Sequence, residues 1–301
     1  MEKVLITGAT GFLGQPCLST LLSCANEVHV LSRNHGGSKQ KKLQIHTVDL
    51  FDAQQVSAAL SQIKPSHLLH LAWLTTPGLY WTATENVRWL EASLKLAQLF
   101  AENGGSRMVV AGSCAEYDWR YGRCHETTTP VSFASLYGAC KNSLRMILES
   151  FGAQIGISIA WARLFFLYGP HEHSNRLVPS VIHSLIQHED VICTNGSYQR
   201  DFLHVQDAAE AVARLLQSNV CGSVNIASGR AVAIREIVQI LATHIGEPGL
   251  VKYRASPAVA SEPLLVVADV TRLREELHWA PQFTLDKGLA QAITWWRSRI
   301  Q

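Results

Sequence analysis

The chain opens with an apolar run that leads directly into a series of evenly spaced glycines. Residues 4–7 (Val-Leu-Ile-Thr) predict a buried strand, and Gly8, Gly11 and Gly14 follow at every third position. A glycine-rich turn between a strand and a helix lets backbone N–H groups and the helix N-terminus approach a pyrophosphate closely. The helix-like run over residues 12–24 comes next. The pattern therefore favours nucleotide binding over a turn that serves packing alone.

Strand-like and helix-like segments alternate through the first half of the chain. Strands are predicted over residues 27–31, 43–48, 67–71, 107–111 and 157–164, with helices over 54–63, 85–103 and 136–152. This alternation predicts an α/β fold with a doubly wound parallel Rossmann sheet.

After residue 169 the predicted elements become shorter. They are helices over 177–188, 206–217, 234–245 and 270–277, and strands over 191–193 and 223–226. We expect a dinucleotide-binding Rossmann domain over 1–169 and a smaller C-terminal α/β substrate-binding region over 170–301. The boundary is not sharp, because the helix near Asp207 is expected to return part of the chain to the main sheet.

Composition and charge exclude several classes of protein. The 301 residues are 47% hydrophobic and 17% charged, with a formal charge of +2, so nucleic acid is not an expected partner. No apolar run reaches the roughly 18–20 residues that span a bilayer, so no membrane is expected either. Seven irregularly spaced cysteines are typical of reduced thiols, and no signal peptide is evident. We expect a cytoplasmic protein.

A second motif carries acid–base chemistry. Tyr137 and Lys141 are four residues apart on a predicted helix, so both side chains project from one face. An ammonium group beside a phenol favours the phenolate. Ser113 follows a predicted strand, where its hydroxyl could hydrogen-bond the same substrate oxygen as Tyr137. The alternative is a surface tyrosine with a solvated lysine; the glycine loop and Ser113 favour a catalytic triplet.

Taken together, these motifs resemble the extended short-chain dehydrogenase/reductase family. Gly8-x-x-Gly11-x-x-Gly14, Ser113, Tyr137-x-x-x-Lys141 and the run 200–207 (RDFLHVQD) resemble in particular its NAD(P)-dependent nucleotide-sugar epimerases, dehydratases and 4-keto reductases. Residues 168–170 and 269–281 extend the resemblance over nearly the whole chain. It implies that Tyr137 exchanges a proton with a sugar hydroxyl or ketone and that Ser113 orients that oxygen. Lys141 would hold the nicotinamide ribose and lower the pKa of Tyr137.

The resemblance also assigns the cofactor contacts. They are Gly8, Thr10, Gly11, Phe12, Leu13, Gly14, Arg33, Asp49, Leu50, Leu71, Ala72 and Lys141. Arg33 occupies the position where NAD-type members carry aspartate, and an arginine there accommodates the 2′-phosphate of NADP. We therefore favour NADP(H), with Asn34 and His35 as further donors. NAD(H) stays possible, because Arg33 could stack on adenine with either cofactor.

A nucleotide-sugar substrate is the implied small-molecule partner, and the resemblance places Arg176, Leu177, Arg200 and Glu262 around it. Trp73, Trp81 and Trp89 cluster after the fourth predicted strand and could line the sugar pocket, where they would favour a deoxygenated face such as a 6-methyl group, although core packing explains Trp89 as well. Arg200 would pair with the diphosphate, unless it forms a salt bridge with Asp201 or Asp207. Arg176 and Leu177 would contact the base and diphosphate, and Glu262 the ribose. The chain departs from the family where Phe166 replaces an asparagine and where the second diphosphate arginine, expected near Val259, is absent, with only Arg254 nearby.

Several residues that relatives use for dehydration or epimerisation are absent from this chain, and their absence limits the reactions that the resemblance implies. Family dehydratases carry acidic residues at positions that here hold Cys114 and Ala115, which disfavours dehydration, although Glu116 one residue further leaves it open. Ala115 and Arg176 replace the cysteine and histidine of reductases that also epimerise. The expectation is a 4-keto-6-deoxyhexose reductase. The alternatives are a 4-epimerase with tightly bound NAD(P) and a catalytically silent NADP sensor or scaffold.

Two further expectations concern metals and assembly. His171 and His173 resemble a metal pair, but the expected mechanism needs no metal and we expect none. The helices over 85–103 and 136–152 resemble the pair that forms a dimer interface in relatives, so a homodimer is expected.

Overall fold

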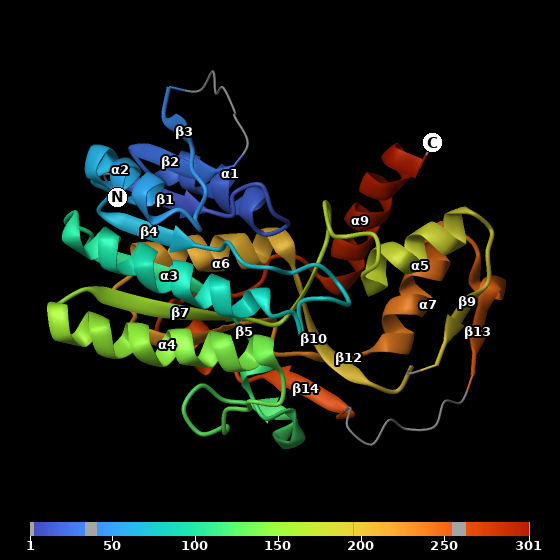
Figure 1. Cartoon of the computed structure of the whole chain (residues 1–301). Helices are drawn as coiled ribbons and strands as arrows, with labels where there is room; N and C mark the ends of the chain where they lie inside the picture. Colours follow the sequence, from blue (N-terminus) through green and yellow to red (C-terminus); the bar gives the residue numbers. More distant parts are fainter. Residues whose placement is uncertain (1–2, 34–40, 195, 255–262, 301) are drawn as a thin grey trace.

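The computed structural model describes residues 3–33, 41–194, 196–254 and 263–300. Its largest layer is a sheet of seven parallel strands in the order β11-β7-β5-β4-β1-β2-β3 (Figure 1). The strands are β1 Lys3–Thr7, β2 Glu27–Ser32, β3 Leu43–Thr47, β4 His67–His70, β5 Arg107–Ser113, β7 Ser158–Leu164 and β11 Gly222–Ile226. The predicted doubly wound parallel sheet is confirmed.

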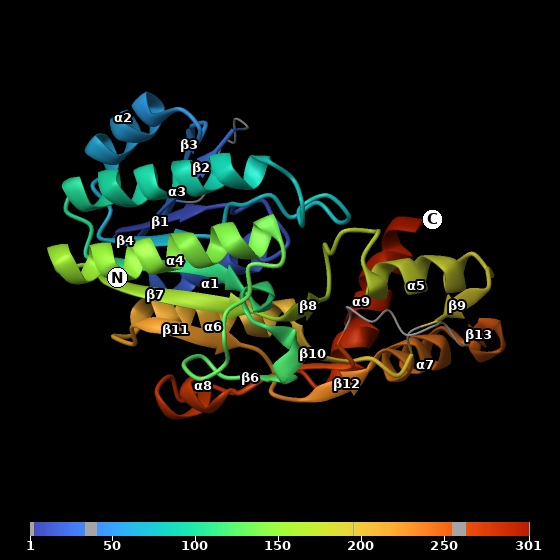
Figure 2. The ribbon, with the colours of Figure 1, turned by 60° about the horizontal axis from the view of Figure 1, so that its bottom comes forward.

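Helices cover both faces of this sheet (Figure 2). One face carries α1 Gly14–Cys24 and α6 Val205–Gln217, and the other carries α2 Ala53–Ile63, α3 Glu85–Glu102 and α4 Leu136–Ile155. Strand β1 shows how the sequence builds both layers. Val4 and Ile6 belong to the core beneath α1 and α6, whereas Leu5 between them belongs to the core beneath α2, α3 and α4. Because both faces are buried, the strand is apolar throughout.

A smaller sheet and a helical layer lie beside the main sheet. The smaller sheet has the order β12-β10-β14-β6, with β8 paired to β10. Its strands are β6 Arg123–Cys124, β8 Phe166–Tyr168, β10 Gln199–His204, β12 Ala231–Ala233 and β14 Leu265–Ala268. Helices α5 Leu177–Ile186, α7 Ile234–Ile245 and α9 Leu285–Ile300 pack against one another, and β9 Val191–Cys193 pairs with β13 Val251–Tyr253. The short helix α8 Thr271–Glu275 packs near β11, and single 3₁₀ turns lie at Cys114–Glu116, Trp119–Tyr121 and Pro248–Leu250.

The two halves of the chain interleave. Helix α6 packs against α1, and β11 adds to the edge of the main sheet beside β7. In the other direction, β6 from the first half pairs with β14 from the second. The chain thus crosses the sequence boundary at residue 169 in both directions.

Several elements of the smaller sheet were not predicted, because they lack the apolar patterns that identified the strands of the main sheet. Strand β10 contains the charged pair Arg200 and Asp201, and both side chains are buried. Asp201 accepts hydrogen bonds from the backbone N–H groups of Ser228, Gly229 and Ala268, at 2.8, 2.9 and 3.1 Å. Because buried polar side chains help to hold β10 in place, its sequence does not show the alternation of apolar residues that would predict a strand. Helix α9 was also missing from the predicted elements, and α8 ends at Glu275, earlier than predicted.

The structure also bears on the cysteines and on the lengths of the apolar helices. All seven cysteines are free thiols. Among the helices that the structure describes, none has the length and hydropathy needed to cross a membrane.

Candidate active site

The glycine loop lies where the main sheet reverses its winding, between the carboxyl ends of β1 and β4. Gly8 has a φ of +72°, and a Cβ there would stand 2.8 Å from the backbone nitrogen of Ala72 in the loop after β4. A Cβ at Gly14 would overlap the carbonyl oxygen of Gly8. These positions therefore require glycine, and the loop backbone can turn tightly onto the first turn of α1. Such a crevice is where doubly wound proteins bind a dinucleotide.

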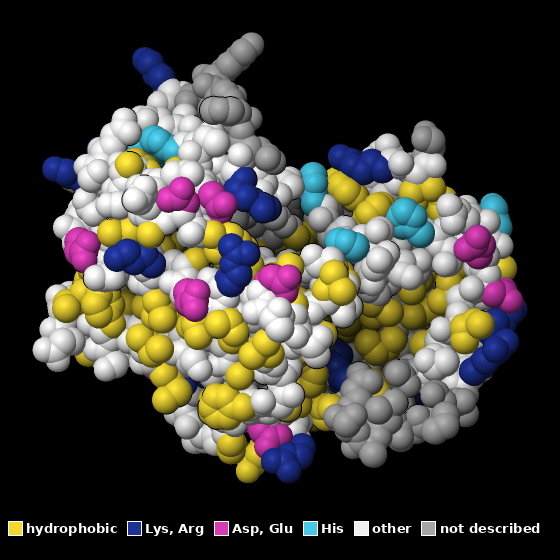
Figure 3. Space-filling view, in the orientation of Figure 1, with side chains coloured by type: hydrophobic (Ala, Val, Ile, Leu, Met, Phe, Trp, Pro, Cys, Tyr) yellow, Lys and Arg dark blue, Asp and Glu magenta, His cyan; other side chains and the backbone are white. Residues whose placement is uncertain are grey.

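A cavity of about 860 Å³ begins at this loop and extends between the main sheet and the α5–α7 layer. Figure 3 shows the surface hollowed between these two parts of the molecule. The cavity is lined by every predicted cofactor contact, by Ser113 and Tyr137, and by Trp73, Arg176, Leu177 and Arg200. Glu262, Val259, Asn34 and His35 lie outside the described residues.

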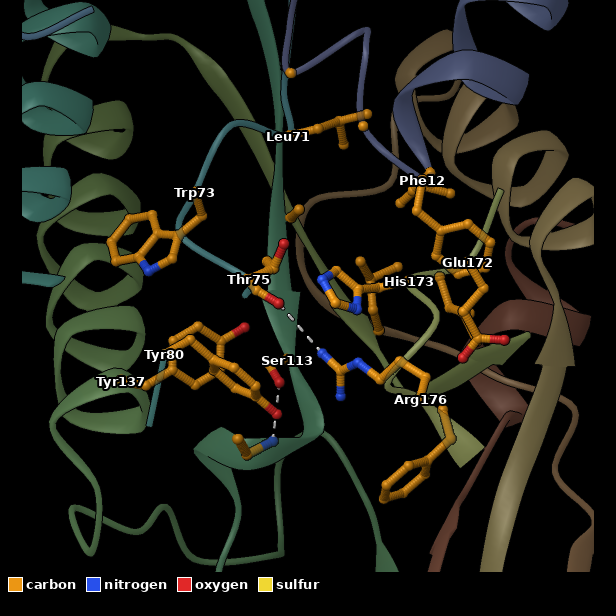
Figure 4. Close-up of a pocket in the computed structure, with 18 of the residues that line it drawn as sticks. Phe12, Leu71, Trp73, Thr75, Tyr80, Ser113, Tyr137, Glu172, His173 and Arg176 are labelled. Carbon is orange, nitrogen blue, oxygen red and sulfur yellow. Dashed lines mark hydrogen bonds between the residues drawn. The ribbon is translucent and has the colours of Figure 1, made fainter. Parts of the chain in front are cut away.

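Local structure positions the predicted catalytic triplet of Ser113, Tyr137 and Lys141. The side chain of Ser135 caps α4 by accepting a hydrogen bond from the backbone N–H of Gly138 at 3.0 Å, which fixes Tyr137 in the first turn. A Cβ at Gly138 would be 2.6 Å from the carbonyl oxygen of Ala115, so α4 packs directly against the turn after β5. This contact brings Tyr137 beside Ser113 (Figure 4). Lys141 lies one turn further along the same helix face.

Burial is the largest influence on the ionisation of Tyr137 and Lys141. Burial raises the pKa of Tyr137 well above its ordinary value, and a side-chain hydrogen bond with Ser113 opposes that rise only partly. Burial also lowers the pKa of Lys141 to about 7, against the effect of Glu116. The net shift of the Tyr137 pKa in this structure is therefore upward, with burial as its largest cause, and the lowering of that pKa by Lys141 stays a prediction.

Ser113 is held by a buried ion pair behind it. Glu116 is fully buried and accepts hydrogen bonds from the backbone N–H of Ser113 at 2.7 Å and from Trp161 Nε1 at 2.9 Å. Its other oxygen accepts from Arg163 Nε at 2.9 Å. The carboxylate therefore faces this cluster rather than the cavity. Glu116 is not placed to remove water from a substrate, which excludes the role that the sequence left open.

Arg176 lies at the catalytic end of the cavity (Figure 4). Its Nη2 donates to the carbonyl oxygen of Thr75 at 3.4 Å, and its guanidinium carbon is 5.3 Å from the ring centroid of Tyr80. The Tyr80 ring meets the Tyr137 ring edge-on at 4.9 Å. This position is close to the reacting groups, whereas the resemblance implied contacts to the base and diphosphate.

Arg200 is buried on the cavity wall. Its Nη1 donates to the carbonyl oxygens of Gln199 and Pro263 at 2.9 and 3.0 Å. The carboxylates suggested as salt-bridge partners are engaged with backbone groups: Asp201 holds three N–H groups, and Asp207 holds those of Gln282 and Phe283 at 3.1 and 3.0 Å.

Glu172 is a site residue that the sequence did not single out. It lines the cavity, is 8% exposed, and its Oε2 is buried without a hydrogen-bond partner. Burial raises its pKa to about 8, although the charge of Arg176 acts in the opposite direction. In the sequence it stands between two histidines in a polar loop, and only the packing of that loop reveals its burial.

An aromatic wall faces Tyr137. Trp81 meets Tyr137 and Trp119 edge-on, at 5.9 and 6.0 Å, and Trp119 lies 6.2 Å from Phe166. The indole N–H of Trp119 is already donated to the carbonyl oxygen of Cys114 at 2.6 Å. The wall therefore offers mainly apolar ring surface to a ligand. The sequence placed Trp81 near the sugar pocket but did not indicate that Trp119 lies beside it.

One group of metal-ligating residue types lies near β6, away from the lining of the cavity, and consists of His125, Glu126 and Asp269. Its members already serve the backbone: His125 Nδ1 accepts from the N–H of Thr127, Glu126 from Asn225, and Asp269 from Thr271. Glu126 Oε2 is buried and has no hydrogen-bond partner among the described residues, so these bonds satisfy the cluster only in part.

Comparison with known proteins places the chain in a family. Residues 4–227 match the model of the NAD dependent epimerase/dehydratase family. The chain is 23% identical over 310 residues to a UDP-glucose 4-epimerase of Corynebacterium glutamicum, covering 94% of this chain and 92% of that one. A structure of UDP-N-acetylglucosamine 4-epimerase from Methanobrevibacter ruminantium, in complex with UDP-N-acetylmuramic acid, is similar with a TM-score of 0.87 at 24% identity, covering 99% and 98%. MoeE5 in complex with UDP-glucose and NAD gives a TM-score of 0.85 at 27% identity, covering 99% and 100%. The chain thus belongs to the NAD-dependent epimerase/dehydratase family of enzymes.

Proposed function

We propose that this enzyme transfers a hydride at a sugar carbon of a nucleotide-linked sugar, as a 4-keto-6-deoxyhexose reductase that uses NADP(H). The observation that carries the proposal is the meeting of Ser113, Tyr137 and Lys141 in the same cavity as the glycine loop. A nicotinamide bound there would supply the hydride. Ser113 would hold the substrate carbonyl oxygen by a hydrogen bond. Tyr137 would give its proton to that oxygen, because the phenol is protonated at neutral pH.

The substrate class is supported by the wall of the cavity. Trp81, Trp119 and Phe166 present aromatic surface beside Tyr137. A sugar with a methyl group in place of a hydroxyl at C6 would bury apolar surface there without leaving a hydroxyl unpaired. The buried ion pair of Glu116 supports reduction over dehydration. We propose that Arg200 and Leu177 contact the nucleotide diphosphate.

The cofactor preference rests on Arg33, which is exposed at the end of β2 and lines the cavity. A guanidinium there suits the 2′-phosphate of NADP, and an aspartate would suit the ribose hydroxyl of NAD. The test is isothermal titration of both reduced cofactors. Arg33→Asp should weaken NADPH binding at least tenfold and leave NADH binding equal or tighter. An unchanged ratio of the two affinities would refute the preference.

A 4-epimerase is the second candidate, because two of the similar proteins described above are named as 4-epimerases. Absorbance of stoichiometric NADPH separates the two functions, since a reductase consumes the cofactor and an epimerase shows no net oxidation. Tyr137→Phe removes the proton donor and should lower turnover about 10²–10⁴-fold. Full activity in that variant would favour the catalytically silent sensor instead.

We further propose a homodimer in the cytoplasm. Helices α3 and α4 lie side by side and expose Val87, Met146 and Ile147 to solvent, at 43, 54 and 47%. A second copy packed on this face would cover these side chains. Light scattering should give twice the chain mass, and Met146→Glu should halve it. The free thiols support a reducing compartment.

A further inference from the structure

Trp73 is fixed in the cavity wall by a buried hydrogen bond. It lies in the loop after β4, is 8% exposed, and donates its indole N–H to Asn86 Oδ1 at 2.8 Å. Asn86 is fully buried, and its Nδ2 donates to the carbonyl oxygens of Tyr80 and Ala83, both at 2.8 Å. The amide orientation is therefore determined, because its nitrogen faces two acceptors and its oxygen faces a donor. The indole ring cannot turn without breaking this chain of bonds.

The face of this ring lies against the ammonium group of Lys141. Lys141 Nζ is 3.9 Å from the Trp73 ring centroid and donates to the carbonyl oxygen of Ala111 at 2.8 Å. Tryptophan is the strongest aromatic partner for a cation, and the interaction grows when both groups are removed from water. Lys141 is 3% exposed, so this condition is met.

We infer that Trp73, tethered by Asn86, is a positioning residue that holds Lys141 in place and stabilises its charged form. This inference rests on the proposed function and on the role that the resemblance implies for Lys141, which is to hold the nicotinamide ribose with its ammonium group. It differs from the sugar-contacting role that the sequence suggested for Trp73.

The charges around Lys141 show why such support matters. Burial brings its pKa down to about 7, so the ammonium is only marginally stable at neutral pH. The charge of Glu116 favours the ammonium. His70 lies between Thr7 Oγ1 and Ser93 Oγ, and burial, with a smaller effect of Lys141, lowers its pKa to about 3, so it faces Lys141 as a neutral ring. Tyr137 is neutral as well. The Trp73 face adds to a small set of favourable contacts.

The experiment follows the protonation of Lys141 directly. Protein labelled with ¹³Cε-lysine is titrated by NMR, and the Lys141 signal is assigned by its loss in Lys141→Arg. Trp73→Leu removes the aromatic face and should lower the Lys141 pKa by about one unit. Trp73→Phe keeps a weaker face and should give a smaller shift in the same direction. The control is Trp89→Leu. It removes the ring that stacks on Trp73 at 6.2 Å but keeps the Trp73 ring that lies against the Lys141 ammonium group.

Turnover provides a second readout. If Lys141 must be charged, the alkaline limb of the kcat/KM profile should move to lower pH in Trp73→Leu by the same amount as the NMR titration. An unchanged Lys141 titration in Trp73→Leu overturns the inference. If that variant does not fold, an unchanged titration in Trp73→Phe overturns it. Because the NMR measurement needs no turnover, failure of the proposed reaction would appear separately, as full activity in Tyr137→Phe.

Discussion

Replacing Glu116 by glutamine should destabilise the protein far more than removing an ion pair near the surface. Both residues of the Glu116–Arg163 pair are buried, at 0 and 1% exposure, and their closest atoms are 2.9 Å apart. Glu116 also accepts from Trp161 Nε1 and from the backbone of Ser113. All of its partners are donors. The amide nitrogen of a glutamine would therefore face an N–H group in either orientation, and Arg163 would be left as an unpaired buried charge.

The expected cost follows from this arrangement. Removing one partner of a buried ion pair costs about 3–5 kcal/mol. Arg163 keeps a 3.3 Å bond to the carbonyl oxygen of Glu126 and a position 4.3 Å over the Tyr117 ring, which soften the loss. We therefore expect about 3 kcal/mol, a large part of the roughly 5–15 kcal/mol that stabilises a typical folded protein.

Urea unfolding at pH 7, followed by tryptophan fluorescence, measures this cost. The matched control is Glu149→Gln, which breaks the more exposed Arg145–Glu149 pair at 2.6 Å and should cost about 0.2–1 kcal/mol. The double variant Glu116→Gln/Arg163→Met should lose less unfolding free energy than the two single variants lose together, because it leaves no unpaired charge. If Glu116→Gln unfolds at the same urea concentration as Glu149→Gln, the ion pair does not hold the turn after β5.

Two further predictions concern the cavity. Gly14→Ala places a Cβ on the Gly8 carbonyl oxygen and should abolish cofactor binding in calorimetry. The control is Gly249→Ala, which has open space around the new Cβ and should bind the cofactor normally. Equal cofactor affinities in the two variants would contradict the close packing of the glycine loop. Glu172 has a folded-state pKa of about 8, above its ordinary value of 4.5, so its contribution to stability is complete below pH 4.5 and is lost as pH rises through about 8. Glu172→Gln should therefore match the unmodified protein at pH 4 and exceed it in urea resistance at pH 8.5, and a constant difference between the two pH values would refute the buried acid.

The sequence predicted the parts of the site that depend on short-range spacing. The glycine loop and Tyr137-x-x-x-Lys141 are local patterns, and the structure brings both to one cavity. Glu116 could not be placed in this way, because its partners Trp161 and Arg163 lie 45 and 47 residues away. The direction of the Tyr137 pKa shift could not be predicted from the sequence either. Spacing shows that a lysine is near, but the degree of burial decides which effect is larger.

The ionisation states of the cavity bear on the direction of the reaction. At neutral pH the raised pKa values of Tyr137 and Glu172 keep both groups protonated, and His70 is neutral. The site is therefore prepared to give a proton rather than to take one. Reduction of a ketone ends with protonation of an oxyanion, whereas oxidation of an alcohol needs a base at the same position. A Tyr137 that is protonated in the free enzyme is in the form that the proposed reduction uses first, and a bound ligand that shifted Tyr137 toward the phenolate would supply the base that the oxidative half of an epimerisation needs.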